Sequence, residues 1–189
     1  MPQPVIAVTV GDPSGIGPEI ALKAIRDPRV VASCRPRVYG PHTAAELDAF
    51  PPGRISAASA KVAYDAIVRA VADAREGRVD AIATAPVNKE AFAAAGLSWR
   101  GHTDLLAHLC GVDDVAMLFW SDRLRVVLAT VHIPLSEVPR ALTAERLLAV
   151  IRLTSRSLPR FGLSAPRLGV AGLNPHAGEN GVLGLEDRD

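Results

Sequence analysis

The stretch Leu173-Asn-Pro-His-Ala-Gly-Glu-Asn-Gly181 is the part of the sequence that most directly indicates the fold. It follows the apolar run Arg167-Leu-Gly-Val-Ala-Gly172, which has the composition of a buried β-strand. A buried parallel strand delivers the residues after it to the carboxyl edge of a sheet, where open α/β folds bind their ligands. We therefore predict a strand over 167–172 and, directly after it, a site that contains the imidazole of His176.

A second stretch has the same arrangement. The apolar run Leu124-Arg-Val-Val-Leu-Ala-Thr-Val131 predicts a strand, and His132-Ile-Pro-Leu135 follows it. A proline stands close to each histidine and stiffens the turn that carries it. Taken singly, each histidine is more often a core or capping residue than a ligand. Two strands that each end in a histidine nevertheless indicate one site built from both.

The composition indicates a protein with a large aliphatic core. Of the 189 residues, 49% are hydrophobic and only 4% are aromatic, as in many α/β proteins. The formal net charge is only +1, so the composition shows no excess of positive charge that would indicate binding to nucleic acid or to an anionic membrane. Cys34 and Cys110 stand far apart without a CxxC spacing, which favours free thiols in a reducing compartment. The pattern contains neither a signal peptide nor a membrane span, so we expect a soluble cytoplasmic protein.

Apolar runs and amphipathic segments alternate along the chain. We expect strands at 5–10, 37–40, 79–84, 115–120, 124–131 and 167–172. We expect helices at about 18–25, 44–49, 59–77, 90–95, 105–110 and 144–157. The fourth and fifth strands follow one another directly and indicate a hairpin, whereas helices separate the others. This order predicts an α/β protein with a mixed sheet.

Loops of small and polar residues follow several predicted strands. Gly11-Asp-Pro-Ser-Gly-Ile-Gly-Pro-Glu19 lets a ligand approach the backbone, but its spacing is neither GxGxxG nor a P-loop, so a tight strand-to-helix turn is an equal alternative. Lys89 follows the third strand and is either a contact for a phosphate or carboxylate or a solvated lysine. Gly101-His-Thr-Asp104 places donors at a helix start, where anions bind, although Thr103 is equally suited to be an N-cap.

His132 and His176 are the clearest candidate metal ligands. Neutral imidazoles with oxygen ligands suit Zn²⁺, Co²⁺, Mn²⁺ or Ni²⁺, and a catalytic metal needs three protein ligands. Glu179 and Asp104 are candidates for the third ligand, although spacing alone does not place them. Hydrolase and calcium-binding functions have no support, because the sequence contains no Gly-x-Ser-x-Gly, HExxH or DxDxDG motif.

Four sequence blocks, taken together, are more specific than any one local pattern. They are Val8-Thr-Val-Gly-Asp-Pro-Ser-Gly-Ile-Gly-Pro-Glu19, Thr84-Ala-Pro-Val-Asn-Lys89 with Gly101-His-Thr-Asp104, Ala129-Thr-Val-His-Ile-Pro-Leu135, and Leu173-Asn-Pro-His-Ala-Gly-Glu179. In this order they resemble the 4-hydroxythreonine-4-phosphate dehydrogenase family of pyridoxal phosphate biosynthesis. The resemblance implies a three-layer α/β/α fold with a mixed sheet, similar to isocitrate and isopropylmalate dehydrogenases, in a two-domain homodimer with the site in the cleft.

The resemblance also implies a reaction. NAD, or NADP as the alternative, takes hydride from the C3 carbinol of 4-phosphohydroxy-L-threonine. The resulting β-keto acid loses CO₂ and gives an aminoketone phosphate. A divalent metal (Zn, Mg, Co or Mn) acts as the Lewis acid. The expected partners are a small phosphorylated substrate and a second copy of the chain, with no nucleic acid and no membrane.

The same resemblance assigns residues to the site. His132 and His176 are carried over as metal ligands, and His102 and Thr103 as contacts to the substrate. Three further candidates are Asp12, Lys89 and Asn174. It assigns no catalytic acid or base, and the residues that bind the nucleotide stay unknown.

Two departures from the family pattern bear on activity. The family's third metal histidine lies in a downstream His-Asp-Gln-Gly motif that this sequence does not contain, and the stretch between Tyr39 and Lys61 is shorter than usual. We therefore expect residues 1–189 to be the N-terminal portion of a two-domain dehydrogenase, without its C-terminal part and with little or no activity alone. The alternatives are a 4-phospho-D-threonate or erythronate dehydrogenase of the same family and an inactive remnant.

Overall fold

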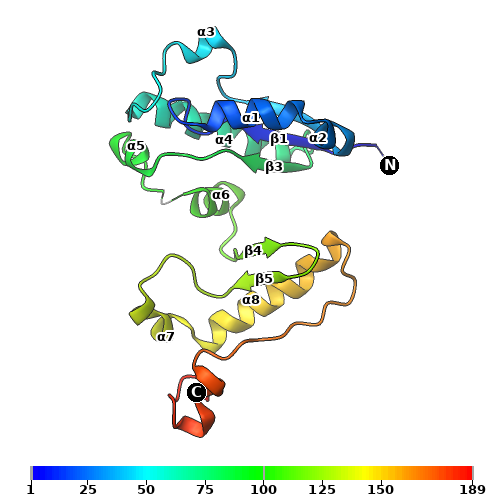
Figure 1. Ribbon diagram of the computed structural model, residues 1–189, viewed down its shortest axis with the longest axis vertical. Helices are drawn as coiled ribbons and strands as arrows, with labels where there is room; N and C mark the ends of the chain where they lie inside the picture. The colour runs from blue at the N-terminus through cyan, green and yellow to red at the C-terminus, as the bar shows by residue number, and fades with distance from the viewer. Residues whose placement is uncertain (1, 100, 189) are drawn as a thin grey trace. The chain divides into compact units, whose positions relative to one another are not determined.

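The computed structural model describes residues 2–99 and 101–188. The chain divides into two compact units, Met1–Val112 (unit 1) and Asp113–Asp189 (unit 2), and each contains its own sheet (Figure 1). Unit 1 has a parallel sheet with helices between its strands, and unit 2 has an antiparallel pair. The predicted α/β class is confirmed, with the parallel and antiparallel pairings in two separate sheets.

Strand β1 (Val5–Thr9) is the centre of the sheet of unit 1, whose order is β2-β1-β3. It pairs in parallel with β2 (Arg35–Tyr39) on one side and with β3 (Ala81–Thr84) on the other. Helical segments make the connections and continue after β3, at α1 (Gly17–Arg26), α2 (Pro28–Ser33), α3 (Ala44–Leu47), α4 (Ala57–Arg75), α5 (Lys89–Ala94) and α6 (His102–Cys110). Helix α2 was not predicted, since six residues are too few to show a helical period.

Helix α4 supplies most of the core of unit 1. Its N-cap is Ser56, whose hydroxyl accepts the backbone N–H of Ser59 at 3.1 Å. Its buried positions recur every three or four residues, as expected for a helix with one apolar face. One cluster on this face joins α4 to α5 and α6, and it consists of Ala60, Ala63, Ile67, Val71, Ala91, Phe92 and Leu105. A second joins α4 to the sheet, and it consists of Ala7, Tyr39, Ala66, Ala70 and Val79.

The Thr9 hydroxyl is fully buried in β1 and has no hydrogen-bond partner among the described residues. An unpaired buried hydroxyl costs about 1–3 kcal/mol, and valine replaces it with a methyl group of the same shape. We expect Thr9→Val to raise the free energy of unfolding by about 1 kcal/mol in urea denaturation. Thr84→Val is the control, because Thr84 pairs with Thr9 in the ladder but is exposed. A loss of stability in Thr9→Val would show that this hydroxyl is hydrogen-bonded in solution.

Unit 2 is built from a hairpin and one long helix. Strands β4 (Met117–Trp120) and β5 (Arg125–Leu128) pair in antiparallel register, and the Ser121 hydroxyl closes the turn by donating to the carbonyl of Leu124 at 2.9 Å. Helix α8 (Ala144–Ser157) begins at the N-cap Thr143 and runs beside the hairpin (Figure 1). Short helical turns complete the unit at η1 (Leu135–Glu137), α7 (Val138–Ala141), η2 (Leu158–Phe161) and η3 (Pro175–Gly181).

The predicted strand at 167–172 is wrong. These residues have no strand assignment in the structure, and all six are exposed. A strand needs a neighbour to accept its backbone hydrogen bonds, and the only ladder of unit 2 among the described residues joins β4 to β5. The apolar composition of 167–172 therefore predicted burial wrongly, because nothing in the described part of the chain provides a strand partner.

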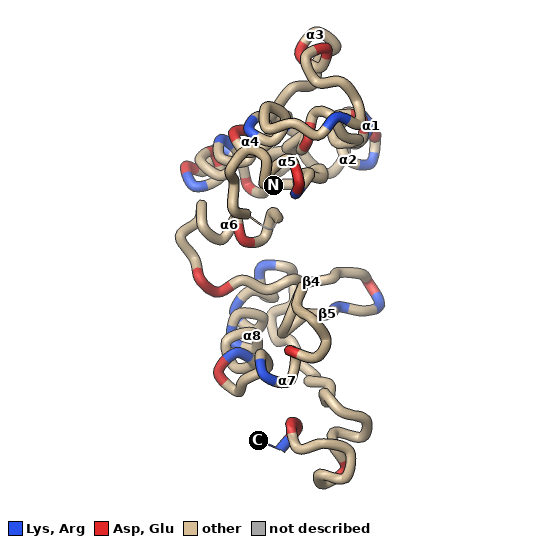
Figure 2. The backbone as a smooth tube through the Cα atoms, turned by 90° about the vertical axis from the view of Figure 1, so that its left-hand side faces the viewer, with Lys and Arg blue, Asp and Glu red and all other residues tan. Residues whose placement is uncertain are grey.

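The two units differ in how much core they contain. Among the residues that the structure describes, 17 hydrophobic residues are buried, and of these only Val150 and Leu158 belong to unit 2. Acidic and basic positions are interspersed along both units, and some form ion pairs, such as Lys23–Glu19 at 2.7 Å and Arg78–Asp73 at 2.6 Å (Figure 2). In the part of the chain that the structure describes, no helix is both long and apolar enough to cross a bilayer.

Candidate functional site

The loop after β1 folds tightly against the loop after β3. Gly11 has a φ of +68°, and the backbone N–H of Asp12 donates to the carbonyl of Pro86 at 2.9 Å. The Asp12 carboxylate accepts the N–H of Ser14 at 2.9 Å, and both side chains are buried. A Cβ on Gly17 would lie 2.0 Å from the carbonyl oxygen of Val10, so this position requires glycine. The loop thus forms a tight strand-to-helix turn, with the Asp12 carboxylate turned into the loop, and its role in binding a ligand stays a prediction.

Lys89 occupies the first turn of α5, directly after the loop that follows β3. The side chain of Asn88 caps this helix by accepting the N–H of Ala91 at 2.9 Å. Lys89 itself is exposed. It lies at the carboxyl end of a parallel strand, where a ligand phosphate or carboxylate can reach it, and its assignment to the site stays a prediction.

His102 and Thr103 lie in the first turn of α6, which begins three residues earlier than predicted. The N-cap position is Gly101, so the alternative role of Thr103 as the N-cap is wrong. Asp104 accepts the backbone N–H of Gly101 at 2.9 Å and so closes the first turn. The fully buried Leu105 anchors the helix in the core of unit 1. The exposed Thr103 hydroxyl and the backbone N–H groups of the first turn are therefore held at a rigid helix start.

The imidazole of His102 is partly withdrawn from solvent. Its Nε2 atom is buried and has no hydrogen-bond partner among the described residues. Burial lowers the pKa of His102 from its ordinary value of 6.5, and the nearby Asp104 carboxylate opposes this shift. A neutral ring with an unpaired nitrogen is suited to accept or donate one hydrogen bond to a bound ligand.

This shift predicts a pH dependence of stability. Folded His102 binds fewer protons than unfolded His102, so stability is full above the ordinary pKa of 6.5 and falls as the pH drops below it. Between about pH 7.5 and about pH 5.5, wild type should therefore lose more unfolding free energy than His102→Gln in urea titrations. Thr103→Val changes a neighbouring side chain that does not titrate and should behave as wild type. Equal losses in wild type and His102→Gln would contradict the burial of this ring.

His132 and His176 both lie in unit 2, and both are exposed. Their backbones are left-handed, with φ values of +56° and +55°. Among the described residues, the non-glycine residues with positive φ are these two and Ala177, Glu179 and Asn180. A left-handed non-glycine residue costs about 1–2 kcal/mol, and such strain gathers at functional sites. The two stretches selected from sequence are therefore also the two that carry this backbone strain.

The loop before His176 is held by carboxylates near residue 187. Asp187 accepts the backbone N–H groups of Leu173 at 2.7 Å and of Asn174 at 3.0 Å. The amide of Asn174 donates to Asp187 at 3.0 Å and to Glu186 at 2.8 Å. The predicted site residue Asn174 therefore directs its amide group to these two carboxylates. Sequence reasoning missed Asp187, because no local pattern relates it to residues 13 or 14 positions earlier.

The described residues do not fit a closed metal site. No group of three or more His, Cys, Asp or Glu side chains with metal-binding geometry occurs in 2–99 or 101–188. A catalytic metal needs three protein ligands, and within unit 2 Glu179 does not complete such a set with His132 and His176. The role of these two histidines as metal ligands stays a prediction.

Comparison with known proteins gives the family. Residues 7–189 match the model of the family described as "Pyridoxal phosphate biosynthetic protein PdxA". The chain belongs to the PdxA family. Among curated PdxA relatives, the chain is 40% identical to the 4-hydroxythreonine-4-phosphate dehydrogenase of Desulforapulum autotrophicum, over 98% of this chain and 66% of the relative. It is 36% identical to the D-threonate 4-phosphate dehydrogenase of Cupriavidus necator, over 96% and 65%.

Solved structures of related dehydrogenases have the same fold. The 4-hydroxythreonine-4-phosphate dehydrogenase of Klebsiella pneumoniae superposes with a TM-score of 0.86 at 36% identity, over 98% of this chain and 67% of that one. The terephthalate 1,2-cis-dihydrodiol dehydrogenase of Burkholderia xenovorans gives 0.67 at 28% identity, over 100% and 67%. The chain thus spans about two thirds of the length of its PdxA relatives, and it has the isocitrate and isopropylmalate dehydrogenase-like α/β fold of that family.

Proposed function

We propose that this chain carries part of the machinery of an NAD- and divalent-metal-dependent dehydrogenase that oxidises 4-phosphohydroxy-L-threonine, with decarboxylation to an aminoketone phosphate. The observation that supports this most is the PdxA match over residues 7–189. The relatives from Desulforapulum autotrophicum and Beijerinckia indica are named 4-hydroxythreonine-4-phosphate dehydrogenases, at 40% and 39% identity. The aromatic diol substrate class has less support, because the diol dehydrogenase superposes less closely.

In this proposal the start of α6 binds the phosphorylated substrate. The first-turn N–H groups and the Thr103 hydroxyl are donors for an anion, and the positive end of the helix dipole favours negative charge. His102 contributes its unpaired Nε2 as a further hydrogen-bonding group. NAD, when bound, would supply the redox chemistry as the hydride acceptor. The chain's own contribution is to hold and orient the phosphorylated substrate.

His132 and His176 are proposed to contact a divalent cation with low affinity. Two imidazoles without a third protein ligand bind a metal more weakly than a complete site does. Calorimetric titration of the chain with Zn²⁺ or Mn²⁺ should show weak saturable binding, and both His132→Ala and His176→Ala should abolish it. If the two histidines are only structural, the wild type shows no saturable binding and the substitutions change stability alone.

Turnover is tested by NADH formation with 4-phosphohydroxy-L-threonine, NAD and metal. We expect this chain alone to be far slower than the Desulforapulum autotrophicum relative in the same assay. Substrate binding is measured separately by calorimetry, and His102→Ala and Thr103→Ala should weaken it. The absence of any binding of the phosphorylated substrate would exclude the proposed function, and turnover equal to that of the relative would exclude the proposed weakness of the metal site.

A second candidate substrate is 4-phospho-D-threonate, or the corresponding erythronate. It is favoured by relatives from Bradyrhizobium diazoefficiens and Cupriavidus necator, named putative D-threonate and D-threonate 4-phosphate dehydrogenases, at 39% and 36% identity. These identities overlap with those of the 4-hydroxythreonine-4-phosphate enzymes, so identity does not separate the two substrates. Parallel titrations with the amino acid and the aldonate separate them, because the true substrate should bind more tightly.

The proposal also includes a homodimer and a cytoplasmic location, which the resemblance of the four sequence blocks supports. Light scattering on the purified chain tests the dimer. An inactive remnant is the third possibility, and the lack of a three-ligand group among the described residues favours it over a fully active enzyme. It predicts neither substrate binding nor saturable metal binding.

A further inference from the structure

The two histidines of unit 2 have backbone conformations that need support from elsewhere in the unit. His132 has a φ of +56°, and His176 begins a run of five consecutive residues, 176–180, that all have positive φ. A residue with a Cβ is strained in this region, because the Cβ lies too close to the following carbonyl oxygen. Such conformations persist only where the surrounding structure fixes them. Contacts within unit 2 must therefore hold each of the two segments.

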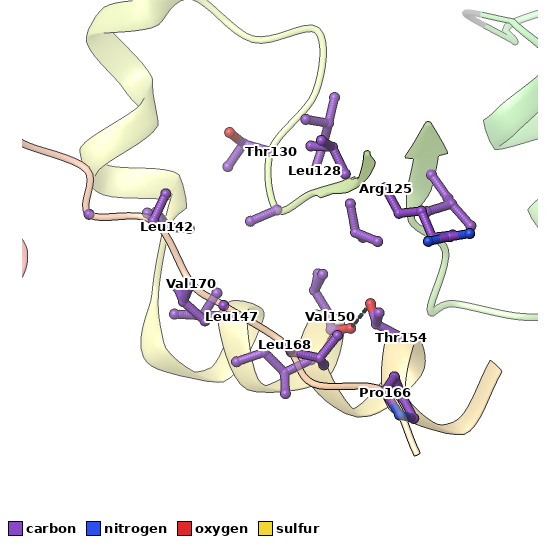
Figure 3. A pocket seen from close by; sticks show the side chains of 18 of the residues that line it. Arg125, Leu128, Thr130, Leu142, Leu147, Val150, Thr154, Pro166, Leu168 and Val170 are labelled. Atoms are coloured by element: carbon purple, nitrogen blue, oxygen red, sulfur yellow. Dashed lines mark hydrogen bonds between the residues drawn. The ribbon is translucent and has the colours of Figure 1, made fainter. Parts of the chain in front are cut away.

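The segment that carries His132 has little backbone support of its own. The β4–β5 ladder ends at the pairing of Met117 with Leu128. Among the described residues, no member of 129–133 takes part in a backbone–backbone hydrogen bond. Thr130 of this segment lines a pocket together with residues of α8 (Figure 3). The position of the segment therefore depends on side chains that reach it, and α8 is the neighbouring helix.

Arg146, in the first turn of α8, makes that contact. Its Nε donates to the carbonyl of Ala129 at 3.0 Å, three residues before His132. Its Nη2 donates to the carbonyl of Val115 at 3.5 Å, just before β4. The two carbonyls belong to opposite ends of the hairpin sequence, and one guanidinium can bind both because its donors have a fixed fork geometry. Arg146 thus joins the open end of the hairpin to the helix.

Asp187 holds the second segment at the corresponding place. Its carboxylate accepts the backbone N–H of Leu173 at 2.7 Å and that of Asn174 at 3.0 Å, three and two residues before His176. The N–H groups of Asn174 and Leu173 lower the pKa of Asp187 from its ordinary value of 3.8. The carboxylate is therefore charged at neutral pH, and both hydrogen bonds are charge-assisted. One side chain thus fixes the backbone just before the left-handed run begins.

The neighbouring charged residues do not make such backbone contacts. Glu186 accepts only the side-chain amide of Asn174, at 2.8 Å. Arg156, on the same helix as Arg146, forms an ion pair with Asp114 at 3.8 Å and no hydrogen bond to the backbone of the described residues. Backbone contact directly before a left-handed histidine therefore distinguishes Arg146 and Asp187 from similar residues nearby.

We propose that Arg146 and Asp187 are positioning residues, which fix the imidazoles of His132 and His176 through the backbone that precedes each histidine. This inference rests on the proposed function only in taking the two histidines as residues of the site. Each positioning residue acts on its own histidine, because its hydrogen bonds reach the segment before that histidine and not the segment before the other. Removal of one should release one imidazole and leave the other in place.

The test measures the one-bond Cα–Hα coupling of each histidine by NMR in the ¹³C-labelled full chain, because this coupling differs between positive and negative φ. Arg146→Met keeps the apolar stem and removes the donors. It should shift the coupling of His132 toward the value for negative φ and leave that of His176 unchanged. Asp187→Leu should have the opposite selectivity. Asp187→Glu restores a carboxylate and should return His176 to the wild-type coupling.

Two matched controls come from the neighbouring residues. Arg156→Met removes a guanidinium from the same helix, and Glu186→Leu removes the adjacent carboxylate. Both should leave the couplings of His132 and His176 at their wild-type values. If Arg146→Met or Asp187→Leu does not fold, Arg146→Lys and Asp187→Asn keep part of the hydrogen bonding. These milder variants should give smaller shifts in the same direction, and the absence of any shift would overturn the proposal.

A purely structural role of Arg146 and Asp187 predicts a different result. Both substitutions would then lower the urea midpoint of unit 2, while the couplings of the two histidines in the folded protein stay at their wild-type values. That result would overturn the proposal, as would a change at both histidines in either variant or an equal change in the controls. All couplings are measured without substrate or cation. A failure here is therefore distinguishable from a failure of the proposed function, which the calorimetric titrations test.

Discussion

Replacing Gly11 with alanine should lower the free energy of unfolding of unit 1 by about 2–5 kcal/mol. Gly11 has a φ of +68°, which an alanine adopts at a cost of about 1–2 kcal/mol. The added Cβ would also lie 2.2 Å from the carbonyl oxygen of Pro86 and 2.7 Å from that of Ala85. Both atoms belong to the backbone, so the loop after β3 must move. The N–H of Asp12, which donates to the same Pro86 carbonyl, would then lose its partner.

Gly53→Ala separates the two causes of this effect. Gly53 has a similar φ of +75°, but nothing lies within 4 Å of the Cβ position. Urea denaturation followed by circular dichroism should therefore show a loss of only about 1 kcal/mol for Gly53→Ala and a clearly larger loss for Gly11→Ala. Equal losses in the two variants would mean that the loops after β1 and β3 are not in contact.

Replacing Phe92 with alanine should lower the free energy of unfolding by about 3–5 kcal/mol. Phe92 is 1% exposed and is the largest fully buried side chain of the described residues. It belongs to the cluster that joins α4, α5 and α6, together with Ile67 and Leu105. The small alanines around it leave little capacity to refill the space, because an alanine side chain has no rotamers with which to adapt. A cavity should therefore remain at the base of the helix that carries His102.

Val31→Ala is the control for this substitution. Val31 lies on α2 in the same unit and is 49% exposed, so its truncation should change stability by less than about 0.5 kcal/mol. Both variants are compared with wild type in urea, and native-state hydrogen exchange at α6 reports whether the loss reaches the His102 segment. If Phe92→Ala is as mild as Val31→Ala, the packing of α5 against α4 is not the one described.

Local patterns in the sequence were sufficient for much of unit 1. Strand β1 was predicted one residue too long, and α4 was predicted two residues too late at each end. The amphipathic period of α4 and the glycines after β1 are short-range signals, so they can be recognised in the sequence without knowledge of the rest of the fold. For the loop Gly11-Asp-Pro-Ser-Gly-Ile-Gly-Pro-Glu19 the sequence left a ligand loop and a tight turn as equal alternatives. The contact with Pro86 shows the geometry of the turn, and the ligand role stays a prediction.

The candidate site was predicted only in part, because local sequence signals show only those features that depend on neighbouring residues. His102 and Thr103 were assigned correctly to a helix start, because a Gly-His-Thr-Asp unit before a leucine-rich segment is a local signal. The carboxylate of Asp187 that holds the loop before His176 could not be found, since its partners are distant in sequence. The left-handed backbone at His132 was equally hidden, because no residue type there requires a positive φ.

The sequence by itself determined the α/β class, the elements of unit 1 other than α2, and the residues that resemble the PdxA motifs, because these depend on periodicity and on short blocks of residues. Only the tertiary structure decided that 167–172 is an exposed, unpaired segment and not a buried strand. It also decided that no three-ligand group forms among the described residues. Both outcomes depend on which segments meet in space. An apolar run indicates that a segment tends to be buried, but it does not determine whether another segment lies beside it to pair with its backbone.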